Sequence, residues 1–249
     1  MTYVLGCDVS VWNDNNSTPQ QIDFEKMKTA GAEFVFIKSS QANWKDQDIV
    51  YNWDAAKGAD ILRGAYHFMT WDIKAIKQAE TMWGIIEHDP GELPPVCDFE
   101  FWNPVPSKAY DWLWNFKVRM KELSGKDCII YTGAFFWGQY GTKAEVWTDS
   151  DLWIASYTNQ TYMEGNVKTL TPWKTWNFWQ WTSNGDGPKY GSEGLDIDLN
   201  WFNGDLAALK KRYGISDSTP TIPPAPIEPS DTDKLDTVYN WWLKRPDLH

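Results

Sequence analysis

The sequence predicts an α/β fold: a TIM-like barrel that is irregular in its second half. Short apolar runs alternate with segments of helical spacing, which is typical of parallel βα units. About eight such runs fall within roughly the first two hundred residues, and eight strands are the number that closes a barrel. The helical segments become sparse after the fifth run, so the barrel is expected to be a degenerate one.

The expected strands are recognised by their apolar residues and by the turn residues between them. The second one, residues 34–40, is almost entirely apolar, as in a strand that is covered on both faces. In chain order, the eight expected strands span residues 3–12, 34–40, 62–69, 95–101, 127–133, 152–157, 177–182 and 195–199.

The expected helices span residues 24–30, 49–57, 73–88, 107–123 and 206–212. Asp23 and Ser107 stand where N-cap residues are favoured, and Gly31 and Gly125 stand where helices end. No helix is expected between the fifth and sixth strands.

The net charge, the tryptophan content and the cysteine count of the chain limit the functions that it can have. The chain of 249 residues carries a net charge of −11, which argues against nucleic acid as a partner and gives no attraction to anionic membranes. Its 18 tryptophans suggest aromatic platforms for a flat ligand such as a sugar. The three cysteines, Cys7, Cys97 and Cys128, are too few and too scattered for a disulfide framework and are expected to be buried free thiols.

Two further segments follow the expected catalytic barrel of residues 1–213. Residues 214–233 form a Pro-rich linker, and residues 234–249 form a short tail with helical potential. The tail could dock on the barrel, mediate oligomerisation or begin a truncated module. The start of the chain shows no signal peptide, and no apolar stretch is long enough for a membrane span.

Acidic residues gather where the expected strands end. Asp98 and Glu100 are two residues apart in one strand, so they share a face with Cα atoms about 6.6 Å apart. Such a pair should hold one proton, which gives the acid and the carboxylate that a glycosidase needs. An exposed strand end with two solvated acids is the simpler alternative. Asp8, Asp196 and Asp198 fall late in strands one and eight, and closure of the barrel brings these acids toward the same mouth.

Several ordered motifs then identify a family. They are Gly-Cys-Asp-Val-Ser at 6–10, Phe-Val-Phe-Ile-Lys at 34–38, Gly-Ala-Tyr-His-Phe at 64–68, Asp-Phe-Glu at 98–100, Tyr-Thr-Gly at 131–133, Leu-Trp-Ile-Ala at 152–155, Trp-Gln-Trp at 179–181 and Asp-Leu-Asn-Trp-Phe at 198–202. Over residues 3–213 the chain resembles the glycoside hydrolase family 25 lysozymes, the Chalaropsis-type muramidases common in phage endolysins. The resemblance implies an irregular (β/α)5(β)3 barrel that cleaves the β-1,4 bond after N-acetylmuramic acid in peptidoglycan.

The resemblance also implies roles for the acids. Glu100 would be the general acid, and Asp98 would be either the nucleophile or an assistant to the N-acetyl group of the substrate. Substrate assistance is favoured, because two residues of one strand are badly placed to act on opposite sides of a sugar. Asp8 and Asp198 would tune the pKa values of this pair, with Asp196 as an alternate for Asp198.

The expected sugar contacts are Tyr66, Tyr131, Trp102, Trp181 and Lys38, with Lys38 also able to pair with an acid. His67 neighbours Tyr66 and so faces the other side of its strand, which favours a structural role. No His or Cys grouping has metal-ligand spacing and no Gly-rich phosphate loop is present, so no metal and no cofactor are expected.

Two other functions compete. A chitinase or endo-N-acetylglucosaminidase also carries Asp-x-Glu on strand four, but the longer chitinase signature is absent, since Val96 and Leu93 replace its acids. A non-catalytic wall-binding barrel has no use for adjacent repelling carboxylates. The expected partner is bacterial peptidoglycan. The expected place of action is the cell wall, reached from the host cytoplasm by holin release or carried on a virion.

Overall fold

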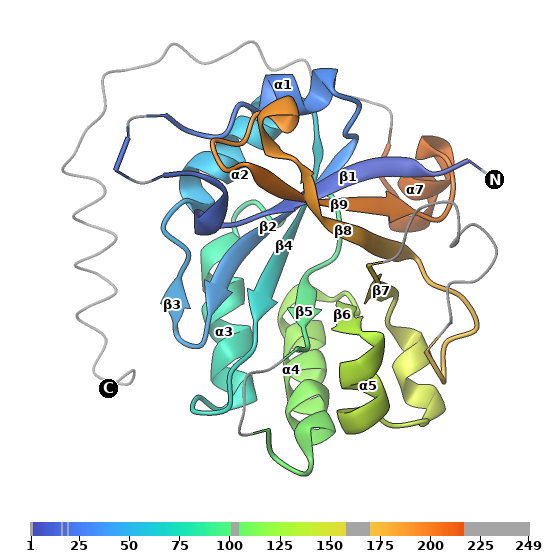
Figure 1. Cartoon of the computed structure of the whole chain (residues 1–249). Coiled ribbons are helices and arrows are strands. Elements are labelled where there is room, and N and C mark those ends of the chain that lie inside the picture. Colours follow the sequence, from blue (N-terminus) through green and yellow to red (C-terminus); the bar gives the residue numbers. More distant parts are fainter. Residues whose placement is uncertain (1, 16, 19, 101–104, 158–169, 217–249) are drawn as a thin grey trace. The chain divides into compact units, whose positions relative to one another are not determined.

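The structure of the chain is a computed structural model that describes residues 2–15, 17–18, 20–100, 105–157 and 170–216. Most of these belong to one compact unit, residues Met1–Ile215 (Figure 1). The expected sugar contact Trp102, most of the expected linker and the whole tail lie outside the described residues.

Eight strands close into a barrel. The closed order is β1, β2, β4, β5, β6, β7, β8 and β9, with β9 paired back onto β1, and the short β3 hangs from the end of β2. The strands are β1 Val4–Val9, β2 Phe34–Gln41, β3 Trp44–Lys45, β4 Leu62–Phe68, β5 Val96–Asp98, β6 Ile129–Gly133, β7 Leu152–Ala155, β8 Phe178–Asp186 and β9 Asp196–Phe202. The TIM-like barrel expected from the sequence is confirmed.

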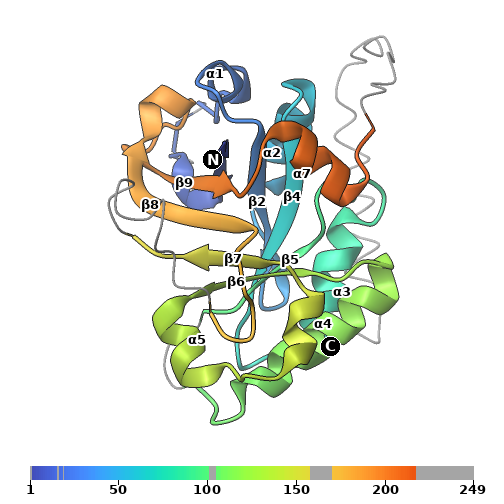
Figure 2. The ribbon, with the colours of Figure 1, turned by 90° about the vertical axis from the view of Figure 1, so that its right-hand side faces the viewer.

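Helices cover the outside of the barrel. They are α1 Phe24–Thr29, α2 Ile49–Gly58, α3 Ala75–Ile86, α4 Ala109–Ser124, α5 Ala134–Tyr140 and α7 Leu206–Tyr213, with 3-10 turns η1 Val11–Asn13, η2 Glu145–Asp149 and η3 Gly187–Tyr190. Helices α3, α4 and α5 follow one another along the same flank in both views (Figures 1 and 2). Each of the first five long strands is followed by a helix, which gives the (β/α)5(β)3 pattern.

The alternation of side chains along the strands separates two apolar cores. The inner core lies inside the barrel, and the outer core lies between the strands and the helices. In β2, Phe34 and Phe36 point into the barrel, whereas Val35 and Ile37 point out toward the helices. A strand that is buried on both faces therefore needs an unbroken apolar sequence, as residues 34–37 have. The inner core fills the lower part of the barrel, and polar side chains take the same inward positions near its mouth.

Two glycines let the aromatic rings fill this interior. A Cβ on Gly6 would lie 2.5 Å from the ring of Phe34, and a Cβ on Gly64 would lie 2.6 Å from the ring of Phe36. Both distances are far below van der Waals contact, so any larger residue would displace the rings. The glycines of the first and third expected strands are therefore packing requirements of the barrel.

The direction of the last strands differs from the expectation. Strand β9 runs antiparallel to both β8 and β1, and β8 and β9 form a long ribbon. Asp198 consequently lies near the start of its strand, where the sequence placed it near the end. The reversed direction still brings Asp198 to the same mouth, because its Cα partner across the sheet is Asp8.

Three local expectations were wrong. Helix α5 occupies part of the segment where no helix was expected, and Gly133 precedes its first turn without a side-chain cap. Ser107 is not an N-cap, because α4 begins at Ala109. Strand β5 is only three residues long and ends at Asp98, so Glu100 lies beyond the strand.

The helix ends with the clearest sequence signals match the structure. The Asp23 carboxylate accepts a hydrogen bond from the backbone N–H of Lys26, and Gly125 ends α4 with φ of 71°. All three cysteines are buried free thiols. No helix in the described part of the chain has the length and apolar character needed to cross a membrane.

Candidate active site

The acids expected from the sequence converge at one mouth of the barrel. Asp8 lies in β1 opposite Asp198 of β9, Asp98 ends β5, and Glu100 follows it by two residues. Strands β1 and β5 point the same way around the barrel and β9 points the other way, so all four positions lie at the carboxyl end of the parallel strands. This is the end at which barrel enzymes carry their active sites.

Asp8 is held by two amides. Nε2 of Gln180 donates to Oδ2 of Asp8 at 2.9 Å, and Nδ2 of Asn200 donates to the same oxygen at 2.7 Å. Burial raises the pKa of Asp8 to about 6, although the hydrogen bonds from Asn200, Gln180 and Asp198 oppose the rise. Asp8 is therefore a buried acid whose charged form is strongly supported by donors.

Asp198 lies opposite Asp8 and is hydrogen-bonded to it. Burial, followed by the charge of Asp8 and a side-chain hydrogen bond to Asp8, raises the pKa of Asp198 to about 9. The same hydrogen bond lowers the pKa of Asp8. The two carboxyl groups therefore form a hydrogen-bonded pair in which Asp198 has the higher pKa.

Glu100 has the electrostatics of a general acid at neutral pH. Burial raises the pKa of Glu100 to about 7, and the charge of Asp8 adds to this rise. A catalytic acid works best when its pKa lies near the working pH, because it is then protonated yet still able to release the proton. Glu100 meets this condition.

Asp98 is buried with an unused acceptor. Its Oδ1 has no hydrogen-bond partner among the described residues. Burial is the largest cause that raises its pKa, the charges of Glu100 and Asp8 add to the rise, and Lys38 lowers it. Asp98 and Glu100 thus form a coupled pair that holds a proton at neutral pH.

Lys38 acts on this pair from a distance. Its Nζ donates to Oε1 of Gln41 at 2.7 Å and lies 5.6 Å from the Trp44 ring centroid and 5.2 Å from that of Phe68. It forms no ion pair with any described residue, so the direct pairing with an acid that the sequence allowed is not seen. Its charge nevertheless lowers the pKa of Asp98.

Two of the expected aromatic contacts lie inside the mouth. Tyr66 and Tyr131 both meet the indole ring of Trp153 edge-on, with centroids 6.5 and 4.5 Å away. The hydroxyl of Tyr131 donates to Oε1 of Gln180 at 2.7 Å. Burial raises the pKa of both phenols well above the usual value, with the nearby acids adding to the rise, so both stay neutral donors.

Other expected site residues lie apart from the acids. Trp181 follows Gln180 in β8 and packs with the outer core, where it stacks on Trp201 with centroids 6.2 Å apart. Asp196 is exposed at the start of β9, opposite Asp186 in the ribbon. Asp198 therefore fits the acidic cluster better than the alternate Asp196.

His67 has the structural place that its position predicted. Its ring is fully buried outside the barrel, bonded to Oγ of Ser40 at 2.8 Å and to Oε1 of Gln78 at 3.0 Å, and it stacks on Phe116. Burial lowers its pKa to about 4, so the ring is neutral at physiological pH.

Exposed aromatic residues surround the mouth. The aromatic rim consists of Trp12 after β1, Trp44 in β3 after β2, Phe135 in α5 after β6, and Tyr157 after β7. Trp12 and Phe135 are 83% and 85% exposed. The flat faces of these rings suit the stacking of sugar rings at the carboxyl ends of the strands.

The sequence reasoning missed the residues that hold Asp8. Gln180 and Asn200 face the interior, since Gln180 alternates with the inner-core Phe178 and Asn200 with the inner-core Phe202. A polar residue at an inward position of an apolar strand was the available signal. Tyr157, whose hydroxyl donates to Oε1 of Gln180 at 2.8 Å, was also missed, although it is four residues from the inner-core Trp153 in the expected strand 152–157.

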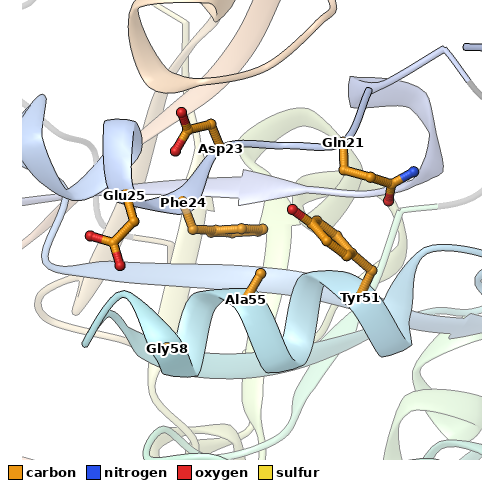
Figure 3. A pocket seen from close by; sticks show the side chains of 7 residues that line it. All are labelled: Gln21, Asp23, Phe24, Glu25, Tyr51, Ala55 and Gly58. Atoms are coloured by element: carbon orange, nitrogen blue, oxygen red, sulfur yellow. The ribbon is translucent and has the colours of Figure 1, made fainter. Parts of the chain in front are cut away.

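Two surface hollows lie away from the acids. One of about 500 Å³ lies between α1 and α2, where Phe24 and Tyr51 turn toward one another and Asp23 and Glu25 stand at the edge (Figure 3). Its Asp23 carboxylate is already used to cap α1. The other, of about 540 Å³, is lined by Asp151 and residues of α7. Neither hollow contains a coupled pair of acids.

No metal centre accompanies the acidic cluster in the part of the chain that the structure describes. Among these residues, no three His, Cys, Asp or Glu side chains are arranged to hold a metal ion. The cluster and its surroundings offer a proton, a buried carboxylate and apolar ring faces, which are components of acid-catalysed glycoside cleavage.

Comparisons with known proteins agree with this chemistry. The model of Glycosyl hydrolases family 25 matches residues 7–189. Lysozyme M1 of Streptomyces globisporus is 31% identical over 222 residues, covering 83% of this chain and 70% of that protein. A bacterial lysozyme from Streptomyces coelicolor has a TM-score of 0.70 at 28% identity, covering 87% of this chain and 100% of that one. A family 25 glycosyl hydrolase from Bacillus anthracis has a TM-score of 0.70 at 26% identity, covering 84% of this chain and 92% of that one.

Proposed function

Since this chain belongs to glycosyl hydrolase family 25 and is a glycoside hydrolase with lysozyme activity, we propose a specific bond and specific catalytic groups. The bond is the β-1,4 linkage between N-acetylmuramic acid and N-acetylglucosamine of peptidoglycan. Glu100 is the general acid, and Asp98 assists the N-acetyl group of the muramic acid residue.

The observation that carries the proposal is the unused acceptor on Asp98 beside a Glu100 of raised pKa. A buried carboxylate oxygen without a partner is costly unless a ligand supplies a donor. The acetamido N–H of the substrate is such a donor. Its arrival at Oδ1 of Asp98 would favour the charged form of Asp98 and leave the shared proton on Glu100.

In the proposed reaction, Glu100 acts first as an acid and then as a base. Glu100 gives its proton to the oxygen that links the two sugars, and the bond from this oxygen to the anomeric carbon of muramic acid breaks. The acetamido oxygen of the same sugar bonds to that carbon and forms an oxazolinium ion, whose positive charge Asp98 stabilises. Water adds to the anomeric carbon and gives its proton back to Glu100, which restores the acetamido group with net retention.

The placement of the two acids supports assistance over direct attack by Asp98. Asp98 ends β5 and Glu100 follows it by two residues, so both belong to one short segment of the chain. A nucleophile and a general acid must approach the anomeric centre from opposite sides, whereas an assistant and an acid can lie on the same side of the chain.

A substitution of the proposed acid tests this function. Glu100→Gln keeps the shape of the side chain but cannot donate a proton at neutral pH, so clearing of a bacterial wall suspension should fall at least about a hundredfold. Glu25→Gln, the same change on exposed helix α1, is the matched control and should keep full activity. Both variants should show the circular dichroism and melting profile of the unchanged protein. Undiminished clearing by Glu100→Gln would show that another residue is the acid.

A protein that cleaves peptidoglycan has to reach the bacterial cell wall. We propose that it reaches the wall from the host cytoplasm after holin release, or as part of a virion. Detection of the protein in purified particles, or only in lysed cells, separates these two routes.

A further inference from the structure

Two buried amide side chains meet on one oxygen of Asp8. Gln180 and Asn200 are both at most 2% exposed, and they are Cα partners across the β8–β9 ribbon. Their nitrogen atoms lie 2.9 and 2.7 Å from Oδ2 of Asp8. We call these two residues the amide clamp.

The orientation of Asn200 is fixed by its other partner. Nε1 of Trp153 lies 2.8 Å from Oδ1 of Asn200, and an indole N–H can only donate. The oxygen of Asn200 therefore faces Trp153, and its NH₂ group faces Asp8. Oδ2 of Asp8 therefore accepts this bond, and such a bond favours the charged form of the carboxyl group.

The orientation of Gln180 follows from the same reasoning. Its Oε1 accepts from the hydroxyls of Tyr131 and Tyr157, at 2.7 and 2.8 Å, which uses both lone pairs of the amide oxygen. A reversed amide would turn Oε1 toward Oδ2 of Asp8, which already accepts from Asn200. The three aromatic donors thus point both amide nitrogens at one carboxylate oxygen.

Among the other charged and titratable groups around Asp8, Asp198 also forms a side-chain hydrogen bond to it, and no such bond from the remaining described groups is seen. The groups around Asp8 are Asp198 on β9, Asp98 and Glu100 at the end of β5, Tyr66 on β4, Tyr131 on β6, Tyr157 after β7 and Cys7 beside it on β1. The acids among them repel a charge on Asp8. Without the clamp, a buried acid in this setting would take up the proton that it shares with Asp198.

We propose that the amide clamp keeps Asp8 as the charged member of the Asp8–Asp198 pair and so makes Gln180 and Asn200 positioning residues of the active site. The shared proton then resides on Asp198. The fixed negative charge of Asp8 faces Glu100 and keeps Glu100 protonated up to a higher pH. This last step rests on the function proposed above, whereas the location of the proton does not.

Carboxyl titration tests the location of the proton without any use of activity. In protein labelled with ¹³C at the aspartate carboxyls, with Asp8→Asn and Asp198→Asn used for assignment, Asp8 should deprotonate at lower pH than Asp198. Gln180→Met is close in shape but cannot donate, and it should raise the midpoint of Asp8 by about one pH unit. Gln78→Met, which removes a fully buried amide that contacts His67 and Thr70, is the matched control and should leave both midpoints in place.

The pH dependence of the rate of wall lysis tests the effect of the amide clamp on catalysis. With Gln180→Met, the alkaline limb of the pH profile should move to lower pH by about half a pH unit, because a neutral Asp8 no longer supports the proton on Glu100. A purely structural role for Gln180 would lower the rate at every pH and leave the limb in place. Gln78→Met should keep the limb in place even where its stability is reduced.

The outcomes separate the two proposals. Deprotonation of Asp198 before Asp8 in the unchanged protein, or an unmoved Asp8 midpoint in Gln180→Met, would overturn the clamp even if the protein lyses walls. An Asp8 midpoint that moves as expected in a protein without muramidase activity would support the clamp and overturn the function. If Gln180→Met does not fold, the isosteric Gln180→Glu replaces it, since a carboxyl oxygen facing Asp8 must also raise the Asp8 midpoint, and an unchanged midpoint there would equally overturn the clamp.

Discussion

The charge of Asp8 should be visible in the pH dependence of the enzyme. Burial is the larger cause that raises the pKa of Glu100 from 4.5 to about 7, and the charge of Asp8 is the smaller one. Asp8→Asn removes that charge, so the pKa of Glu100 should fall by about one pH unit. A general acid must be protonated to act, and activity is lost as the pH rises through its pKa. At pH 7 the protonated fraction would then drop from about a half to about a tenth, a loss of roughly fivefold beyond any loss seen at pH 5.

The assay is the initial rate of wall clearing from pH 4 to 9 at limiting substrate, with the position of the alkaline limb compared between Asp8→Asn and the unchanged protein. The ratio of rates at pH 7 and pH 5 removes any effect of the substitution that does not depend on pH. An alkaline limb that stays in place, or moves to higher pH, would refute the electrostatic link between Asp8 and Glu100.

Three further predictions concern other parts of the site and barrel. If Asp98 assists the acetamido group, a slow fluorinated substrate should leave no covalent adduct on Asp98, and a mass increase there would instead identify it as the nucleophile. Gly6→Ala should lower the free energy of unfolding by about 2 kcal/mol, seen as a lower melting temperature, because its Cβ would lie 2.5 Å from a ring of β2. Gly58→Ala, where nothing lies within 4 Å of the added Cβ, should not destabilise, and equal losses in both would contradict the packing argument. Trp44→Ala in the aromatic rim should weaken binding to insoluble peptidoglycan a few-fold. Trp114→Ala, a similarly exposed tryptophan on α4, should not, and equal weakening would count against the rim.

The strands and most helices could be predicted because their signals are local. Residues 34–37 are apolar on both faces and could belong only to a buried strand, and Asp23 and Gly125 mark helix ends by their own backbone chemistry. The convergence of Asp8 with the Asp98–Glu100 pair also followed from strand order alone, since parallel barrel strands end at one mouth.

The remaining features depend on tertiary context. The antiparallel direction of β9 is set by its pairing with β1 and β8, and no local pattern in residues 196–202 encodes it. Helix α5 lacks a side-chain cap and is only seven residues long, so its sequence signal is weak. Trp181 was expected to contact sugar because it stands in the Trp-Gln-Trp motif. Side-chain alternation turns it toward the outer core, whereas its neighbour Gln180 faces the acids.

Exposure was the property least accessible from the sequence. Trp12 and Phe135 stand at the mouth almost fully exposed, whereas Trp153 and Trp179 are fully buried, and the residue type is no guide to which is which. The amide clamp was hidden for a related reason. Its chemistry lies in which atom of Gln180 or Asn200 faces Asp8, and three aromatic donors from other segments decide that.

The central claim is that this lysozyme cuts after N-acetylmuramic acid by means of Glu100. Mass spectrometry of the soluble muropeptides released from purified walls, reduced with borohydride before digestion to single sugars, tests it most directly. We expect reduced muramic acid as the new chain end, and none of it above background with Glu100→Gln. Reduced N-acetylglucosamine as the new end would show that the enzyme is not a muramidase, because it would place the cleavage at the other glycosidic bond.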